Sequence, residues 1–145
     1  MKLDNILIGD HKSREDTTHH IKLVDFGFAT QYVDKNGQHQ PRQGIEVFRS
    51  NMIFATVNQF DFVVTSRRDD MISLVYLLVF LFNRGRVPFV APAEFDKKQV
   101  FKYISTVKKT IKPEELIAGI DSSNNFLNFT NEILNLKYEE KPSYD

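Results

Sequence analysis

The first part of the chain alternates short apolar runs with long polar, turn-rich stretches. Residues 5–8 and 21–24 are apolar and partly β-branched, and a polar segment without periodicity separates them. We expect these two runs to pair as strands of a hairpin with a long loop. Residues 31–50 are polar and contain the turn signals Asn36-Gly37, Pro41 and Gly44. This stretch is expected to be irregular and mobile.

After residue 66 the pattern becomes helical. The run that begins at Arg67 is apolar on every face through Phe82 and stops at Asn83-Arg84-Gly85, which predicts a buried central helix. Residues 95–109 repeat apolar positions every three or four residues, a short helix is expected to begin at Pro113, and residues 126–136 trace one more helical face. The interpretation is an α+β fold that is mainly α.

Two lysine pairs lie in the second of these predicted helices or at its edge. Lys97-Lys98 and Lys108-Lys109 are most simply interpreted as solvated positions on the polar face of an amphipathic helix.

Composition narrows the class of protein. The 145 residues are 41% hydrophobic and include 13 Phe, which is enough for a packed core and excludes disorder of the whole chain. The formal net charge of zero gives no field that would attract nucleic acid or an anionic membrane, so neither is expected as a partner. There is no Cys and no secretory signal pattern, and the most apolar run is too short to span a bilayer. An intracellular protein is expected.

One tripeptide suggests chemistry. Asp25-Phe26-Gly27 directly follows the second predicted strand, and Lys2 and Asn5 stand at the start of the first. Oxygen atoms of Asn5 and Asp25 at one end of a hairpin would form a site suited to Mg²⁺, and Lys2 could neutralise a phosphoryl group in transfer. The alternative is that Asn5 caps a turn and Asp25 merely ends a strand.

The whole chain resembles the casein kinase I family. The stretches that carry the resemblance are KLDNILIG, IKLVDFGFATQY, FATVN, SRRDDMISLVYLLVFLFNRGRVPF, KKQ, PEEL and YEEKPSYD. The SRRDD start, the FNRG exit and a Ser-Ile-Asn-like triplet (here Thr56-Val57-Asn58) in place of the usual Ala-Pro-Glu are specific to that family.

The resemblance implies a partial protein kinase domain over residues 1–145. It divides into a catalytic-loop remnant (1–8), a metal-site hairpin (5–27), an activation segment (25–58) and a helical C-lobe (59–145). Lys2 would be the phosphate-contacting lysine, and the family's cofactors Mg²⁺ and ATP would be bound by Asn5, Asp25, Phe26 and Gly27, with Asn5 and Asp25 as metal ligands. Productive binding of these cofactors by this chain alone is not expected. Asp70 matches a buried acid that organises the catalytic loop in kinases.

Parts that phosphoryl transfer requires do not occur in these residues. The chain has no Gly-x-Gly-x-x-Gly loop and no His-Arg-Asp base. Where the family has basic residues around the substrate groove, this chain has Ile53 and Val100, which cannot neutralise an anion.

The favoured hypothesis is therefore a catalytically inactive, pseudokinase-like C-lobe that serves as a structural or interaction subunit. Its protein partner would cover the surface on which an N-lobe normally packs. The alternative is a fragment of an active serine/threonine protein kinase whose N-lobe is not included, with Met1 an internal residue or a mis-assigned start. A Mg²⁺ or nucleotide sensor ranks third, because the N-lobe holds most of the adenine.

Overall fold

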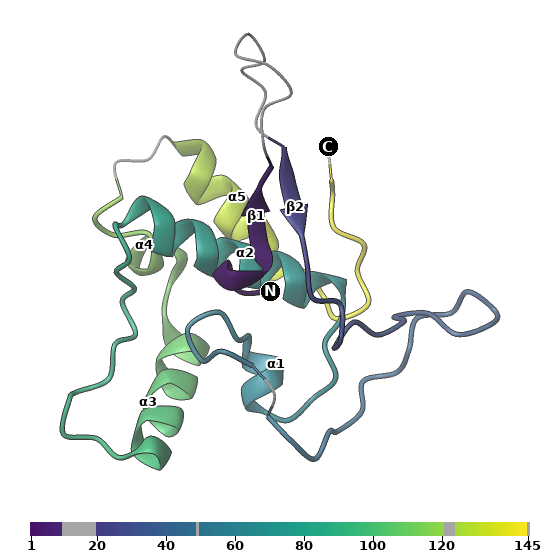
Figure 1. Ribbon diagram of the computed structural model, residues 1–145, viewed down its shortest axis with the longest axis horizontal. Helices are drawn as coiled ribbons and strands as arrows, with labels where there is room; N and C mark the ends of the chain where they lie inside the picture. Colours follow the sequence, from purple (N-terminus) through teal and green to yellow (C-terminus); the bar gives the residue numbers. More distant parts are fainter. Residues whose placement is uncertain (10–19, 49, 121–123, 145) are drawn as a thin grey trace, which may run out of the picture.

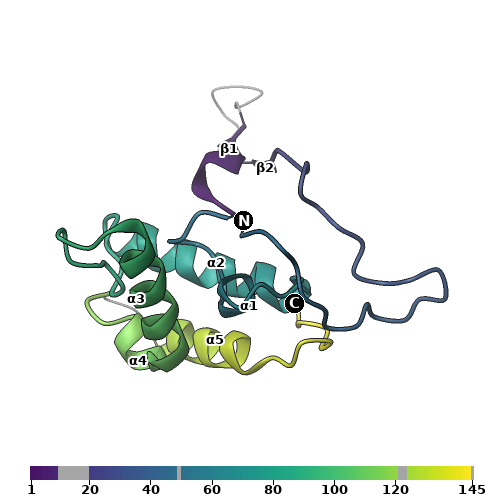
Figure 2. The same cartoon turned by 90° about the horizontal axis from the view of Figure 1, so that it is seen from below.

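A two-stranded hairpin stands on a body of helices in the computed structural model, which describes residues 1–9, 20–48, 50–120 and 124–144. A single 3₁₀ turn, η1 (Leu3–Asn5), leads into β1 (Ile6–Ile8), and β1 pairs antiparallel with β2 (Ile21–Leu23). Both views show the hairpin projecting from the helical body (Figure 1, Figure 2). The predicted hairpin is confirmed, while most of its predicted loop lies outside the described residues.

The segment after β2 is irregular, as predicted. Within its described residues it contains no helix or strand before α1 (Val57–Phe60), only the isolated bridges Val33↔His39 and Gly44↔Val63. Figure 1 shows it running as a long loop away from the helices before it returns to α1. Polar composition and turn residues explain this path, because no apolar face exists that could bury a helix or strand here.

The central helix is α2 (Arg67–Phe82), and it forms the middle of the core. Val75 and Val79 are fully buried, as expected of a helix that is apolar all round. The helix ends at Asn83, and Gly85 takes a left-handed φ of +80° while its N–H donates to the carbonyl of Phe80 at 2.7 Å. This Gly-containing exit was predicted from the sequence.

The remaining helices pack around α2. They are α3 (Lys97–Thr110), α4 (Pro113–Leu116) and α5 (Asn124–Asn135), with α5 against α2 and α4, and α3 against α1. The predicted helix over 95–109 starts later than expected, because the Asp96 side chain accepts the Gln99 N–H and so makes Asp96 the N-cap. In the described part of the chain, no helix has the length and apolar character needed to cross a bilayer.

Two features were not predicted correctly. The short helix α1 was missed, although Thr56 and Gln59 have the spacing of a capping box and the Gln59 side chain accepts the Thr56 N–H at 3.0 Å. The placement of Lys108 on a solvated face was wrong, because its side chain is buried against the core. Helical periodicity assigned it to the polar face, but the segment that precedes α1 lies over that part of α3 and covers it.

Candidate nucleotide and metal site

The hairpin brings Asn5 and Asp25 to one end of the sheet. Asn5 is the last residue of η1, and Asp25 follows β2 after Val24. The Val24 N–H donates to the Asn5 carbonyl at 3.0 Å, which continues the strand pairing toward Asp25. As a result, the Asn5 Nδ2 lies 3.5 Å from the Asp25 Oδ2. The structure thus places side by side the two residues that the sequence predicted as metal ligands.

The backbone of Asp25 is strained. Its φ of +62° lies in the left-handed region, which costs a non-glycine residue about 1–3 kcal/mol. Aspartate tolerates this conformation better than most residues because its short side chain can bond locally, and here the Gly27 N–H lies 3.4 Å from Asp25 Oδ1. Strain of this kind clusters at functional sites, and in this case it directs the carboxylate toward Asn5.

A cavity of about 710 Å³ opens beneath the end of the hairpin. Its wall on the hairpin side includes Lys2, Asn5, Asp25 and Phe26. The other wall comes from the segment before α1, from α1 itself and from the start of α2, and it includes Ser50, Asn51, Gln59, Asp69, Asp70 and Ser73. The site therefore combines a cationic side chain, an amide and a carboxylate on one wall with polar groups on the other.

Phe26 and Gly27 differ in their relation to this cavity. Phe26 lines it and is 68% exposed, whereas Gly27 lies in the turn that follows and is not part of the lining. The contribution of Gly27 is its backbone N–H, which approaches the Asp25 carboxylate. A role for either residue in binding a nucleotide stays a prediction.

The donor set of the site fits Mg²⁺. This ion takes hard oxygen ligands and usually needs only one or two carboxylates when substrate phosphates and waters complete its shell. The Asp25 carboxylate receives only the long contacts from Asn5 and Gly27, so its oxygens are not committed to strong hydrogen bonds within the described residues. Among those residues, no cluster of three or more His, Asp or Glu side chains suited to a metal ion occurs.

Adjacent acids at the start of α2 have opposite environments. Asp69 is 1% exposed and accepts hydrogen bonds from Thr56 Oγ1 at 2.6 Å, from Asn58 Nδ2 and from the Ser66 N–H at 2.9 Å. Asp70 is exposed and faces the cavity. Desolvation raises the pKa of its carboxyl, the chain's amino terminus acts in the opposite direction, and Asp69 raises it further.

The resemblance to the casein kinase I family implied that Asp70 is a buried acid. Within these residues, the buried acid is Asp69. The reason is the helical turn: Asp69 points toward α1 and Ser66, whereas Asp70 points into the cavity, where no described residue donates a hydrogen bond to its carboxylate. The role of Asp70 as an organiser of a catalytic loop stays a prediction. The Asp69 network was missed, although Thr56, Asn58, Ser66 and Asp69 all belong to the stretches that carried the resemblance.

Ile53 and Val100 are both half-buried and pack against the core. Both side chains are aliphatic, so neither position carries a charge that could bind an anion.

Comparison with known proteins agrees with the fold. No protein-family model matches the chain. A probable casein kinase I homolog of Encephalitozoon cuniculi (strain GB-M1) is 32% identical to it over 145 residues. The chain is similar to a casein kinase I homolog over nearly its whole length. The alignment covers 99% of this chain but 43% of the relative, so the chain spans less than half the length of the curated relative that it matches.

The mainly helical fold with one antiparallel strand pair is consistent with a kinase-like C-terminal lobe. The α+β, mainly α fold class is confirmed. The division of the chain into remnant, hairpin, activation segment and C-lobe stays a prediction.

Proposed function

We propose that these residues form the C-lobe side of the catalytic cleft of a casein-kinase-I-like protein kinase, which transfers a phosphoryl group from Mg²⁺-ATP to a serine or threonine hydroxyl. The observation that carries the proposal is the placement of Asn5 and Asp25 together above the cavity, with Lys2 in the same wall. A fold that used these residues only as a turn cap and a strand end would not need a strained Asp25 beside an open cavity.

Each residue has a distinct role in this proposal. Asp25 and the Oδ1 of Asn5 hold the metal, and Lys2 contacts the transferring phosphoryl group and offsets its negative charge. Bound Mg²⁺ supplies neutralisation of charge that develops on the phosphate oxygens. The strain at Asp25 keeps the carboxylate in place before the ligand arrives, which lowers the cost of organising the site on binding.

The other parts of the machinery must come from outside these residues. The chain contains neither a Gly-rich loop for the phosphates nor a His-Arg-Asp base. The hairpin and the residue Phe26 after it also expose apolar side chains that another lobe would cover, namely Leu7, Ile8, Ile21, Leu23 and Phe26. An apolar surface of this kind indicates an interface. In the proposed kinase, an N-lobe covers it.

The second candidate is a non-catalytic subunit, in which a separate protein partner covers the same hairpin surface. The observation that favours it is the pair Ile53 and Val100, since both lie where the resemblance leads us to expect substrate-binding cations. Neither candidate calls for nucleic acid or a membrane as a partner. The two candidates differ in whether Asn5 and Asp25 still serve phosphoryl transfer.

The test is a phosphorylation assay on the native protein that contains these residues, with Mg²⁺, ATP and a set of serine and threonine peptides. We expect transfer that Asp25→Asn reduces by at least 10²-fold, because the carboxylate that holds the metal is lost. Asp34→Asn is the matched control, since Asp34 is an acid of the same segment whose carboxylate only accepts N–H groups of its own turn. Equal activity in Asp25→Asn and wild type would refute the proposed site.

Absence of transfer in the wild type would instead favour the non-catalytic subunit. In that case, a shift of the thermal unfolding midpoint by Mg²⁺ and ATP separates a binding protein from one that has lost the ligand altogether.

A further inference from the structure

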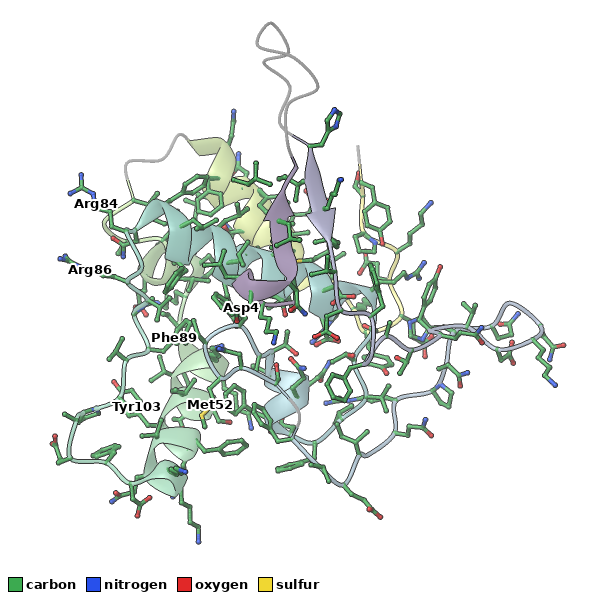
Figure 3. All side chains as sticks on the ribbon, viewed as in Figure 1. Asp4, Met52, Arg84, Arg86, Phe89 and Tyr103 are labelled. Atoms are coloured by element: carbon green, nitrogen blue, oxygen red, sulfur yellow. The ribbon has the colours of Figure 1, made fainter. Side chains whose placement is uncertain are left out.

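Lys108 occupies an unusual place for a lysine. It lies near the end of α3 and is only 6% exposed. Its ammonium nitrogen lies over three aromatic rings, 4.1 Å from the centroid of Tyr76, 4.3 Å from that of Phe89 and 5.5 Å from that of Phe60. Figure 3 shows the labelled Phe89 and Met52 on the side of the molecule where α3 lies. Within the described residues, no carboxylate forms an ion pair with this ammonium.

The partners of Lys108 are backbone carbonyl groups. Its Nζ donates to the carbonyl oxygens of Met52 at 2.9 Å, Ile53 at 2.7 Å and Ala55 at 2.7 Å. An ammonium has three N–H donors, so these contacts use all of them. In the described part of the chain no other group donates to these three oxygens, which belong to a segment without regular secondary structure.

This arrangement has an energetic cost and a structural result. Burial lowers the pKa of Lys108, and the carbonyl oxygens and ring faces offset part of that cost because they stabilise the charged form. The structural result is that three backbone carbonyl groups outside any helix or sheet, those of Met52, Ile53 and Ala55, accept hydrogen bonds. Three of the four carbonyl groups of residues 52–55 thus point to one cation, and the fourth, that of Phe54, accepts from the Ser73 hydroxyl of α2.

The segment that Lys108 holds is connected to the cavity at both of its ends. Just before it, Ser50 and Asn51 line the cavity wall that faces the hairpin. Just after it, Thr56 and Asn58 donate to the buried Asp69. The position of Ser50 and Asn51 therefore depends on the groups that hold the segment after them, namely the carboxylate of Asp69, the ammonium of Lys108 and the Ser73 hydroxyl, which donates to the Phe54 carbonyl at 2.8 Å.

We propose that Lys108 is a positioning residue for the peptide substrate: by holding the carbonyl groups of Met52, Ile53 and Ala55, it sets the cleft wall against which the phosphate acceptor is placed. The inference rests on the proposed kinase function. The hairpin wall carries the metal and phosphate groups, so the acceptor hydroxyl must approach from the opposite wall. Lys108 touches neither substrate and acts only through this backbone.

The test compares Lys108→Met with Lys109→Met in the native protein. Methionine has a similar length and suits an aromatic surrounding, but it offers no donor to the carbonyl groups. Lys109 is the matched control, because it is the next residue of the same helix, is partly exposed and pairs with Asp61. Two readouts are used, namely amide hydrogen exchange and steady-state kinetics with peptide and ATP varied separately.

In hydrogen exchange, the amides of Phe54 and Ala55 are the reporters, since both donate to the Asn51 carbonyl within the held segment. We expect Lys108→Met to speed their exchange by about tenfold or more, and Lys109→Met to leave it unchanged. Unchanged exchange in Lys108→Met would overturn the proposal. This readout does not need catalysis, so it remains decisive for Lys108 even if the wild type transfers no phosphate and the proposed function fails.

In kinetics, we expect Lys108→Met to raise the KM for the peptide by about tenfold, with kcat and the KM for ATP within about twofold of wild type. A purely structural role would lower the folded fraction, which lowers kcat and leaves the KM for the peptide unchanged, and that result would overturn the proposal. Lys108→Gln, which keeps two N–H donors, should give intermediate values. Loss of folding in both variants would also overturn it, because Lys108 would then be a general support of the core.

Discussion

Asp69 offers the sharpest test of how the segment before α1 is attached to the helical body. We consider Asp69→Asn, which keeps the size of the side chain and removes its charge. The carboxylate accepts from Thr56 Oγ1, Asn58 Nδ2 and the Ser66 N–H and Oγ, all in a buried environment. An asparagine replaces one acceptor oxygen with an NH₂ group, which then faces at least one of these donors.

The magnitude follows from these contacts. A hydrogen bond to a charged group contributes about 1.5–3 kcal/mol, and a buried donor left without an acceptor costs about 1–3 kcal/mol. The variant loses one charged acceptor and leaves one buried donor without an acceptor, so we expect a decrease of ~3 kcal/mol in the free energy of unfolding. This is a large part of the 5–15 kcal/mol that is typical of a domain, so the loss should be plain in a urea titration followed by circular dichroism.

Asp70→Asn is the control on the adjacent residue. Asp70 is an exposed residue, but partial desolvation of its carboxyl and the nearby Asp69 raise the pKa of that carboxyl. The fold therefore does not stabilise its charged form. We expect its unfolding free energy to stay within about 0.5 kcal/mol of wild type. Equal losses in the two variants, or a loss below ~1 kcal/mol in Asp69→Asn, would refute the assignment of the anchor to Asp69.

Two further predictions concern other parts of the chain. Gly85→Ala should lower the free energy of unfolding by ~1–2 kcal/mol because Gly85 has a φ of +80°. Gly44→Ala should not, because Gly44 has no positive φ and a Cβ there would meet only the Phe62 carbonyl oxygen, at an ordinary contact distance of 3.7 Å; urea midpoints of the two variants test this. Ile21→Ser together with Ile8→Ser should weaken association with whatever covers the hairpin, measured by partner binding, while leaving the helical circular dichroism unchanged because both side chains are exposed.

The elements with strong local signals were predictable from the sequence. The all-apolar run after Arg67, its Gly-containing exit and the Pro at the start of α4 each fix an element through residues that lie next to one another. The pairing of Asn5 with Asp25 was also predictable, because two short strands joined as a hairpin bring the residues that flank them together.

The burial of Lys108 and Asp69 was not predictable in this way. Helical periodicity states which face of α3 is polar, but not that an irregular segment distant in sequence will cover that face. Likewise, the pair Asp69-Asp70 reads as two similar acids at a helix start, where both would suit the helix dipole. Only the tertiary contact with Thr56 and Asn58 distinguishes them.

Asp69 and Lys108 both hold the segment before α1. A buried carboxylate and a buried ammonium hold neighbouring parts of the same irregular segment, Thr56 and the carbonyl of Ala55, and within the described residues they do not pair with each other. Each is expensive to bury, so a chain that needed only stability would gain more from apolar residues at both positions. Their presence is better explained by a need to fix the path of one stretch of backbone. That stretch directly follows Ser50 and Asn51, which line the cavity, and this is the reason to expect that the cavity wall, and not the core alone, depends on Lys108.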